Sequence, residues 1–364
     1  MNKIKINKYP QHDRMDLQIR TAASVEYDPD QYLHAYAEDP RSSEGRYVSS
    51  DLMKETFPEY AASNESRSRY NTPLHNSAAV LAAEQYSRVV NDTSHPERDQ
   101  AVFLTGVPGA GKTTAIMNGG PFRNDERVIY EGQLSRSDTA IPKIQEAIDA
   151  GLVPTIVAIH TPPEVALDNT LKRFEIEGRG ASIQAMARIQ SELPDGLQKV
   201  HEHFGDKVNL VVIDRSNGLN NSIGLSGWEH LSKLQEGNYE QIRERLSSVL
   251  EQKADENRIS LSAYRQAAGL SPLDNGQSAH IEHGGRAEQL QAGGEVGRFH
   301  GEQAVTNTEL SVQAQATSLR AETGKSEQAI PTVQPANADT SKDHSIAVDD
   351  GEYSLSVRAF SSLL

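Results

Sequence analysis

Residues 100–117, with the sequence QAVFLTGVPGAGKTTAIM, constrain the fold of this chain more than any other stretch. The apolar run at its start predicts a short buried strand, and the G-x-x-x-x-G-K-[ST] spacing that follows is typical of a phosphate-binding loop. Glycines let such a loop curl so that successive N–H groups point at phosphate oxygens, which a Cβ atom would obstruct. The residues at the fixed positions are Gly106, Gly111, Lys112 and Thr113.

The same loop predicts a nucleotide and a metal ion as ligands. A helix that begins at Lys112 would add the positive end of its dipole to the anion site. Lys112 would reach the β- and γ-phosphates, and the hydroxyl of Thr113 would hold Mg²⁺. We therefore expect ATP and Mg²⁺ as cofactors, against the alternative of a glycine-rich turn that binds nothing. The expected nucleotide-binding residues are Gly106, Gly109, Ala110, Gly111, Lys112, Thr113 and Thr114.

The composition of the 364 residues argues against several other classes of protein. A net charge of −15 with no basic patch argues against nucleic-acid binding. The absence of cysteine excludes disulfides, thiolate zinc sites and a thiol nucleophile. No apolar run approaches the roughly 18 residues that a membrane-spanning helix needs, and the basic start lacks the apolar segment of a secretory signal. We expect a soluble, cytoplasmic protein, with translocation into a target cell as the alternative.

Short apolar strands and helical patterns alternate along the middle of the chain. Such alternation indicates βαβ units, so we expect an α/β fold with a P-loop kinase-like parallel sheet of about five strands and helices on both faces. The expected strands lie near 47–48, 101–105, 127–130, 155–159 and 210–213, and the sheet pattern ends after Asp214.

Helix signals lie between the last two of these strands. Thr161 and Glu164 stand at the spacing of a capping box, which predicts a helix with Thr161 as its N-cap. Apolar periodicity then predicts one helix over 181–193 and another over 197–204.

Composition divides the chain into four expected regions. Residues 1–45 are polar and broken by prolines, so we expect a loosely structured N-terminal arm with one helix near 31–37. The P-loop domain is expected over 46–215, and a helical extension over 216–269. Residues 270–364 are rich in Gly, Gln, Ala, Ser and Thr, and such low-complexity sequence buries too little apolar surface to offset the entropy of ordering. We expect this tail to be largely disordered.

Phosphoryl transfer needs a group that receives the proton of the acceptor and positive charge around the migrating phosphoryl group. Asp51 follows the first expected strand, at the sheet edge where ligands bind in α/β proteins, so we expect it to be the base. Arg173 and Arg179 are expected in a mobile lid, and Glu131 is expected to orient metal-bound water or substrate. His160 is expected to be a packed histidine. The alternatives are a helix cap for Asp51 and solvated positions for the two arginines.

Three segments, GVPGAGKTT, SSDLMKETFPEY and VAIHTPPEVALDNTLKRFEIEGRG, together resemble the zeta toxin family. The resemblance covers about residues 46–215 and implies a small kinase with a nucleotide-kinase-like core. It further implies ATP-dependent phosphorylation of a sugar hydroxyl of UDP-N-acetylglucosamine, which inhibits growth, and an antitoxin protein as a partner.

The resemblance also implies roles for individual residues. Asp51 resembles the catalytic aspartate of the family, and Lys54 stands where a basic residue that contacts the substrate follows it. The other positions that match the family are the Walker residues Lys112 and Thr113 and the lid residues Arg173 and Arg179.

One departure from the family concerns the order of the segments. The aspartate segment precedes the phosphate loop in this chain, whereas it follows the loop in the family. A parallel strand can be supplied from either side of the loop, so the sheet can still be assembled. Two other functions fit the sequence: a P-loop NTPase that acts on a protein partner, and a translocated effector or interaction protein whose tail binds the partner.

Overall fold

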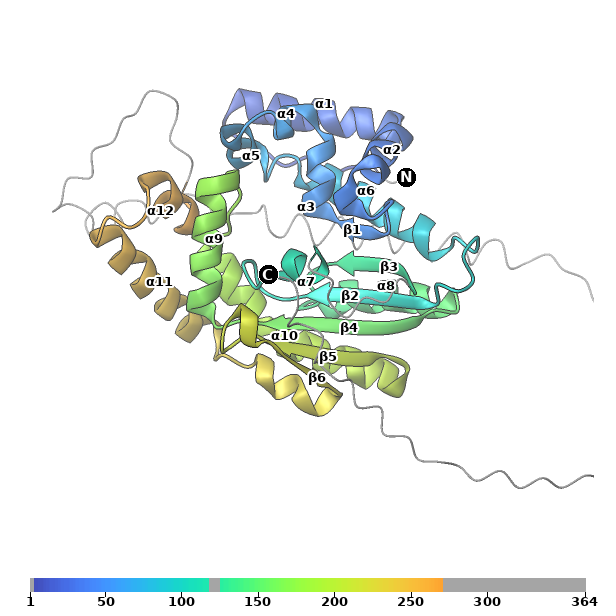
Figure 1. Ribbon diagram of the computed structural model, residues 1–364. Coiled ribbons are helices and arrows are strands. Elements are labelled where there is room, and N and C mark those ends of the chain that lie inside the picture. Colours follow the sequence, from blue (N-terminus) through green and yellow to red (C-terminus); the bar gives the residue numbers. More distant parts are fainter. Residues whose placement is uncertain (1–2, 118–124, 271–364) are drawn as a thin grey trace, which may run out of the picture. The chain divides into compact units, whose positions relative to one another are not determined.

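The computed structural model describes residues 3–117 and 125–270, which form an α/β fold around a six-stranded sheet (Figure 1). The strands follow the spatial order β1-β3-β2-β4-β5-β6. The first five in this order run parallel, which confirms the predicted sheet, and β6 pairs antiparallel with β5. The strands are β1 (Tyr47–Ser49), β2 (Gln100–Thr105), β3 (Glu126–Glu131), β4 (Val153–His160), β5 (Asn209–Asp214) and β6 (Ile223–Ser226).

Helices cover both faces of the sheet, because alternate residues of each inner strand enter two different cores. Ala101 and Phe103 of β2 belong to one core, and Val102 and Leu104 belong to the other. The α-helices of the described residues are α1 (His12–Tyr27), α2 (Pro29–Glu38), α3 (Ser50–Met53), α4 (Pro58–Ala61), α5 (Asn64–Tyr70), α6 (His75–Val90), α7 (Lys112–Met117), α8 (Ser137–Asp149), α9 (Pro163–Glu177), α10 (Ile183–Phe204), α11 (Tyr239–Asp255) and α12 (Leu261–Ala267).

The strand order places the expected site residues at one edge of the sheet. Because β3 lies between β1 and β2, the carboxyl ends of these three strands are neighbours despite the unusual order of the segments in the sequence. Asp51 follows β1, Glu131 ends β3, and the phosphate loop follows β2. Ligands of open α/β sheets bind at this carboxyl edge.

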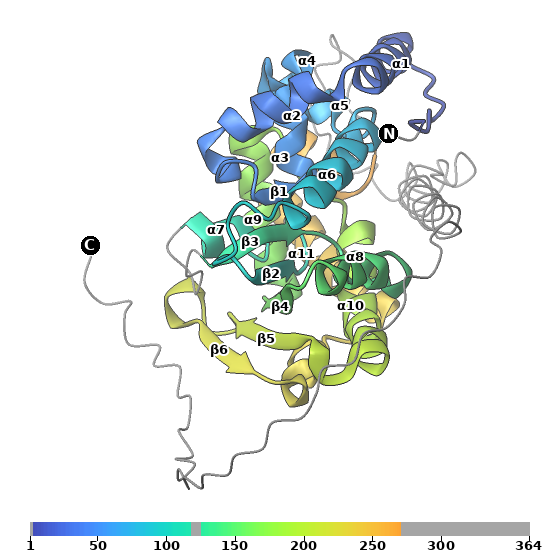
Figure 2. The same cartoon turned by 90° about the vertical axis from the view of Figure 1, so that its right-hand side faces the viewer.

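The prediction that the sheet ends after Asp214 is wrong, because β6 extends it by one antiparallel strand. The residues of β6 are mostly exposed, so the strand lacks the alternation of buried and exposed side chains that reveals a strand in the sequence. Figure 2 shows β6 at the end of the sheet opposite to the helices that gather near β1.

The expectation of a loosely structured N-terminal arm is also wrong. Helices α1 and α2 pack into the core beside β1 through buried residues that include Leu17, Val25, Leu33 and Tyr36. The predicted helix over 31–37 is part of α2. Prolines delimit the helices rather than disrupting them, since Pro29 opens α2, where its missing N–H costs little.

A single helix, α10, replaces the two helices predicted over 181–193 and 197–204. Pro194 lies within it and removes only one intrahelical hydrogen bond. The flanking side chains of Leu193 and Leu197 are buried, and this packing on both sides of the proline favours the continuous helix.

Residues beyond the sheet form α11 and α12, where the sequence predicts helices. Ile242, Leu246 and Leu250 of α11 face the core. The division of the chain into four regions stays a prediction, and the expected disordered tail, 270–364, lies outside the described residues apart from its first residue.

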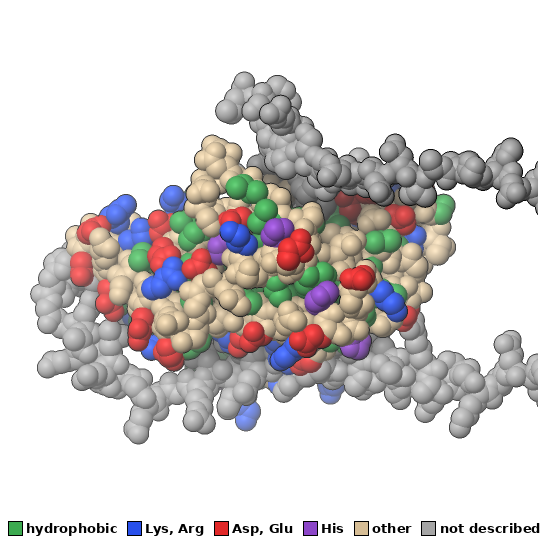
Figure 3. Space-filling model, turned by 90° about the horizontal axis from the view of Figure 1, so that it is seen from below, with side chains coloured by type: hydrophobic (Ala, Val, Ile, Leu, Met, Phe, Trp, Pro, Cys, Tyr) green, Lys and Arg blue, Asp and Glu red, His purple; other side chains and the backbone are tan. Residues whose placement is uncertain are grey.

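None of the described helices is long and apolar enough to cross a membrane. On the face that Figure 3 shows, acidic and basic side chains are interspersed among polar ones rather than gathered by sign. This face therefore offers no basic patch of the kind that attracts nucleic acid.

Candidate functional site

The phosphate loop has the backbone conformation that its glycines predict. Gly106, Gly109 and Gly111 have φ values of 144°, 83° and 86°, a region that other residues rarely adopt. Helix α7 begins at Lys112, directly after the last of them. The ammonium group of Lys112 donates to the carbonyl of Gly106 at 2.9 Å and to that of Val107 at 3.3 Å, so it lies across the mouth of the loop. The loop therefore fits a polyphosphate.

Glu131 connects the end of β3 with this loop. Its carboxylate lies 3.7 Å from the ammonium of Lys112 and accepts a hydrogen bond from the hydroxyl of Tyr47. Tyr47 also hydrogen-bonds with the hydroxyl of Thr113. Burial and the charge of Glu131 raise the pKa of Tyr47 well above its ordinary value, so its hydroxyl remains protonated and can donate. Glu131 and Thr113, the two groups expected near a metal ion, are thus held together by one tyrosine.

Asp51 lies in the first turn of α3, and it is not the residue that caps this helix. The cap is Ser49, whose hydroxyl accepts from the N–H of Leu52 at 3.5 Å. The carboxylate of Asp51 instead accepts from the ammonium of Lys54 at 2.8 Å, and half of its side-chain surface is exposed. The helix-cap alternative is therefore not needed to explain Asp51.

The charge of Lys54 keeps the pKa of Asp51 far below its ordinary value, with smaller contributions from their hydrogen bond and from Arg173. Asp51 is thus ionised at neutral pH. Lys54 itself is buried, with 2% of its side chain exposed, and it also donates to the amide oxygen of Asn71 at 2.8 Å. This burial favours support of Asp51 over direct contact with a substrate, which stays a prediction.

His75, the first residue of α6, lies in the same cluster. Burial and, to a smaller extent, the neighbouring charge of Lys54 together lower its pKa to about 4. His75 is therefore neutral at physiological pH, and it can hydrogen-bond without adding a charge beside Asp51.

Arg173 and Arg179 meet at one carboxylate at the end of α9. Glu177 accepts from Arg173 at 3.3 Å and from Arg179 at 2.6 Å. Arg179 also lies 3.9 Å from Glu55, which is on the Asp51 side of the site. The two arginines are thus paired side chains rather than freely solvated ones, and their role in a lid stays a prediction.

Three side chains that the sequence analysis did not assign to the site hydrogen-bond to backbone carbonyls of the phosphate loop. Thr161 donates to the carbonyl of Ala110 at 3.2 Å, and Asn169 donates to that of Gly109 at 2.9 Å. Arg215, the residue after β5, donates to the carbonyls of Ala110 and Gly111. For Arg215, the available signal was its position directly after a predicted strand.

The contact made by Thr161 overturns its predicted role as an N-cap. Helix α9 begins at Pro163 with Pro162 as its cap and no side-chain cap, while the hydroxyl of Thr161 turns to the loop. Glu164, the other half of the expected capping box, pairs with Arg245 of α11 at 2.7 Å. Tertiary partners have replaced the local ones.

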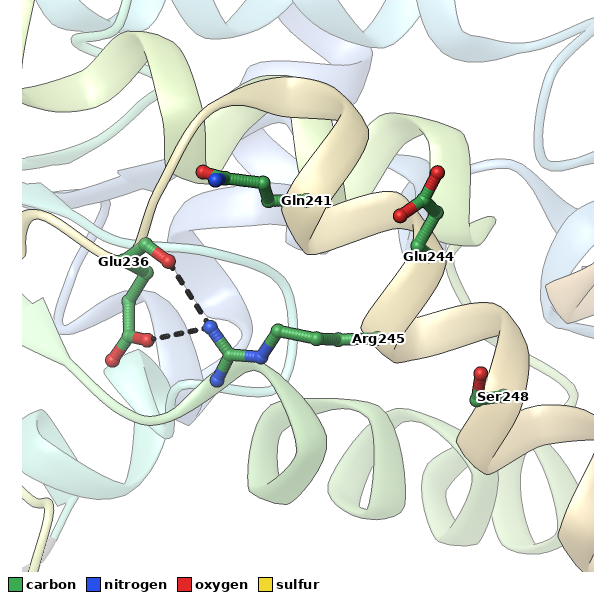
Figure 4. A pocket seen from close by; sticks show the side chains of 5 residues that line it. All are labelled: Glu236, Gln241, Glu244, Arg245 and Ser248. Carbon is green, nitrogen blue, oxygen red and sulfur yellow. Dashed lines mark hydrogen bonds and ion pairs between the residues drawn. The ribbon is translucent and has the colours of Figure 1, made fainter.

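A shallow depression of about 570 Å³ lies on α11 and on the segment before it (Figure 4). In it, Arg245 donates to the backbone and the carboxylate of Glu236 at 3.0 and 3.1 Å. Glu236 also lies 3.3 Å from the buried ring of His160, which is packed as the sequence predicts. No residue of the phosphate loop lines this depression, so the candidate site remains at the carboxyl edge of β1, β3 and β2.

The segment that follows the phosphate loop is similar to a known protein family. The family model described as Zeta toxin matches residues 122–222. Over these residues the chain is similar to the zeta toxin family. The match includes Glu131 and the two lid arginines, whereas Asp51 and the phosphate loop precede it. The chain thus combines a phosphate loop with a following segment that is similar to the zeta toxin family, whose members are kinase-like.

A solved structure is similar to this chain over much of its length. A chain from a study of the PezAT chromosomal toxin-antitoxin system of the human pathogen Streptococcus pneumoniae is similar over 69% of this chain and 98% of its own length. The sequence identity is 14% and the TM-score is 0.33. No curated protein matches this chain in sequence.

Proposed function

We propose that this protein is an ATP-dependent kinase that transfers a phosphoryl group to a sugar hydroxyl of a UDP-N-acetylglucosamine-type sugar nucleotide, and that it acts as a growth-inhibiting toxin. The observation that carries the proposal is the position of Asp51, an ionised and half-exposed carboxylate that a single strand, β3, separates from the strand before the phosphate loop. A carboxylate at this edge of the sheet can orient an acceptor hydroxyl and receive its proton.

Asp51 would accept a hydrogen bond from the acceptor hydroxyl and thereby aim its oxygen at the γ-phosphorus. Because the pKa of Asp51 is so low, it is a weak base towards a free hydroxyl. In a loose transition state, however, the hydroxyl loses its proton late, when its oxygen is already bonding to phosphorus and has become acidic. Asp51 then contributes by orienting the hydroxyl first and accepting its proton last.

The loop side of the site would hold the donor. Lys112 would leave the carbonyls of Gly106 and Val107 to contact the β- and γ-phosphates, a shift that needs only its side chain to move. Mg²⁺ bound at Thr113 would supply neutralisation of charge on the transferred phosphoryl group. Glu131 and Tyr47 would orient the hydroxyl of Thr113 and the water molecules around it.

The lid arginines would act after they exchange partners. Arg173 and Arg179 now neutralise Glu177, and the charge of Asp51 also acts on Arg179. A bound polyphosphate offers more negative charge than one carboxylate, so closure over the nucleotide would draw both guanidinium groups from Glu177 to the migrating phosphoryl group. An antitoxin partner stays a prediction that the family resemblance motivates.

A direct assay tests the function. The purified chain is incubated with Mg²⁺ and γ-labelled ATP, with UDP-N-acetylglucosamine, UDP-glucose or free N-acetylglucosamine as the acceptor. We expect label in the first sugar nucleotide, and none with Lys112→Ala, whereas the exposed control Lys199→Ala behaves as the wild type. Free phosphate without a labelled sugar would indicate the NTPase alternative.

A further inference from the structure

Arg215 is an unusual arginine, because its charge is buried and no carboxylate of the described residues pairs with it. It is 8% exposed, and it donates through Nη1 to the carbonyls of Ala110 and Gly111 at 3.0 and 2.9 Å. Its Nε is buried with no acceptor within the described part of the chain. The nearest carboxylate in sequence, Asp214, is turned to the hydroxyl and N–H of Ser216.

Stability alone does not explain such an arrangement. A buried guanidinium that lacks an opposite charge and leaves one donor unsatisfied costs free energy. Burial accordingly lowers the pKa of Arg215, with no carboxylate to raise it again. An anion that binds on the other side of the loop would supply the missing negative charge.

The planarity of the peptide bond links the arginine to the inside of the loop. In a trans peptide the C=O of one residue and the N–H of the next point in opposite directions. When Arg215 holds the carbonyls of Ala110 and Gly111 towards β5, the N–H groups of Gly111 and Lys112 must point away from β5. These N–H groups belong to the part of the motif that cradles phosphates.

The packing between the arginine and the loop is close. A Cβ atom added to Gly111 would overlap Nη1 of Arg215. A side chain at Gly111 would therefore push the guanidinium of Arg215 away from the loop, in addition to the strain of a φ of 86°. The carbonyl of Ala110 accepts a further hydrogen bond from Thr161, so the same peptide group is held from two sides.

We propose that Arg215 is a positioning residue for the phosphate loop: it fixes the N–H groups of Gly111 and Lys112 towards the phosphates of a nucleoside triphosphate and adds an uncompensated positive charge behind them. The proposal rests on nucleotide binding by this loop, and it assigns to the residue after β5 a role that no sequence motif marks. It requires that the contribution of Arg215 grows with the number of phosphates on the ligand.

Calorimetric titration of the full chain with Mg²⁺ and ATP, ADP, AMP or adenosine tests this dependence. Arg215→Gln should weaken ATP binding by about tenfold or more, ADP binding by less, and adenosine binding hardly at all, because only phosphates contact the cradle. Arg215→Lys keeps the charge but loses the planar fork, so its affinity for ATP should be intermediate. Arg243→Gln, on the surface of α11, is the matched control and should bind ATP as the wild type does.

Chemical rescue separates positioning from a structural role. Guanidinium at low millimolar concentration should restore ATP affinity to Arg215→Ala and leave the control unchanged. Equal losses for ATP and adenosine, full ATP affinity in Arg215→Gln, or failure of both Arg215→Gln and Arg215→Lys to fold would each overturn the inference. Failure of the wild-type chain to bind Mg²⁺ and ATP would overturn the proposed function itself, so the two failures are distinguishable.

Discussion

The ammonium of Lys54 lies 2.8 Å from the carboxylate of Asp51 and is almost wholly buried beneath it. The side chain of Asp51 is half exposed to solvent, whereas that of Lys54 is buried. The pair therefore gives the site a carboxylate that stays ionised and keeps a fixed direction. The ammonium of Lys54 also donates to the side chain of Asn71, in the segment before α6, and this second hydrogen bond holds the ammonium in place.

Asp51→Asn should reduce kcat by about 10² or more, the scale of a lost general base, while the affinity for ATP is nearly unchanged. It should also lower the free energy of unfolding by an amount on the order of 1 kcal/mol, since the buried ammonium of Lys54 loses its charged partner while Asp51 is only half buried. Turnover, ATP titration and thermal melting of this one variant measure the three quantities. Full activity would make Asp51 a structural residue.

Lys54→Met should introduce an acidic limb into the pH profile of kcat. Without the ammonium, the pKa of Asp51 rises towards its ordinary value near 3.9, and burial raises it further. Activity should then fall as the pH decreases through this raised pKa, whereas the wild type keeps Asp51 ionised. The exposed Lys199→Met serves as the control, and identical profiles in all three proteins would contradict the role of Lys54.

Tyr36→Phe should impair catalysis from a distance. The hydroxyl of Tyr36 donates to the carbonyl of Tyr47 at 2.6 Å and accepts from the N–H of Ser49 at 3.1 Å, so α2 completes the free edge of β1. Its loss should cost about 1–3 kcal/mol of stability and lower kcat, because β1 positions Asp51. Tyr27→Phe, at a residue that is 91% exposed, should change neither quantity. A Tyr36→Phe variant with normal stability would show that β1 does not depend on this contact.

Gly109→Ala should weaken ATP binding more than its backbone conformation alone explains. The added Cβ would overlap the carbonyl of Ala166 and lie 2.6 Å from the hydroxyl of Thr170, so the loop and α9 must separate. Gly151→Ala is the matched control, since Gly151 has a similar φ of 78° but no atom within 4 Å of an added Cβ. The difference in melting temperature and in ATP affinity between the two variants measures the contact. Equal effects would assign the whole loss to backbone strain.

Replacing both Arg173 and Arg179 by alanine should lower kcat far more than ATP affinity, because their charge is used as the phosphoryl group migrates. Glu177→Gln should not lower kcat, since it releases both guanidinium groups from their present partner. Steady-state kinetics with ATP titration check the pattern. A loss of affinity in proportion to the loss of rate would make the arginines ground-state contacts.

The sequence alone predicted the features that depend on neighbours along the chain. The phosphate loop is recognisable because its spacing, its glycines and the helix that starts at Lys112 are all local requirements. Buried strands such as β2 and β4 are recognisable because both of their faces are apolar. The placement of Asp51 and Glu131 at one edge followed from these strands and from the rule that parallel strands end together.

Only the tertiary structure decided the features that depend on partners far away in sequence. The N-terminal helices are ordered by their packing against β1 and α6, and the exposed strand β6 is held by its hydrogen bonds to β5. Thr161 does not cap α9 but donates to the carbonyl of Ala110, which lies 51 residues earlier in the sequence. Arg215 donates to the same carbonyl from 105 residues away. Local patterns report which residues can form a helix or a strand. Which buried donor meets which acceptor depends on how these elements pack, because each buried polar group must find a partner wherever the fold offers one.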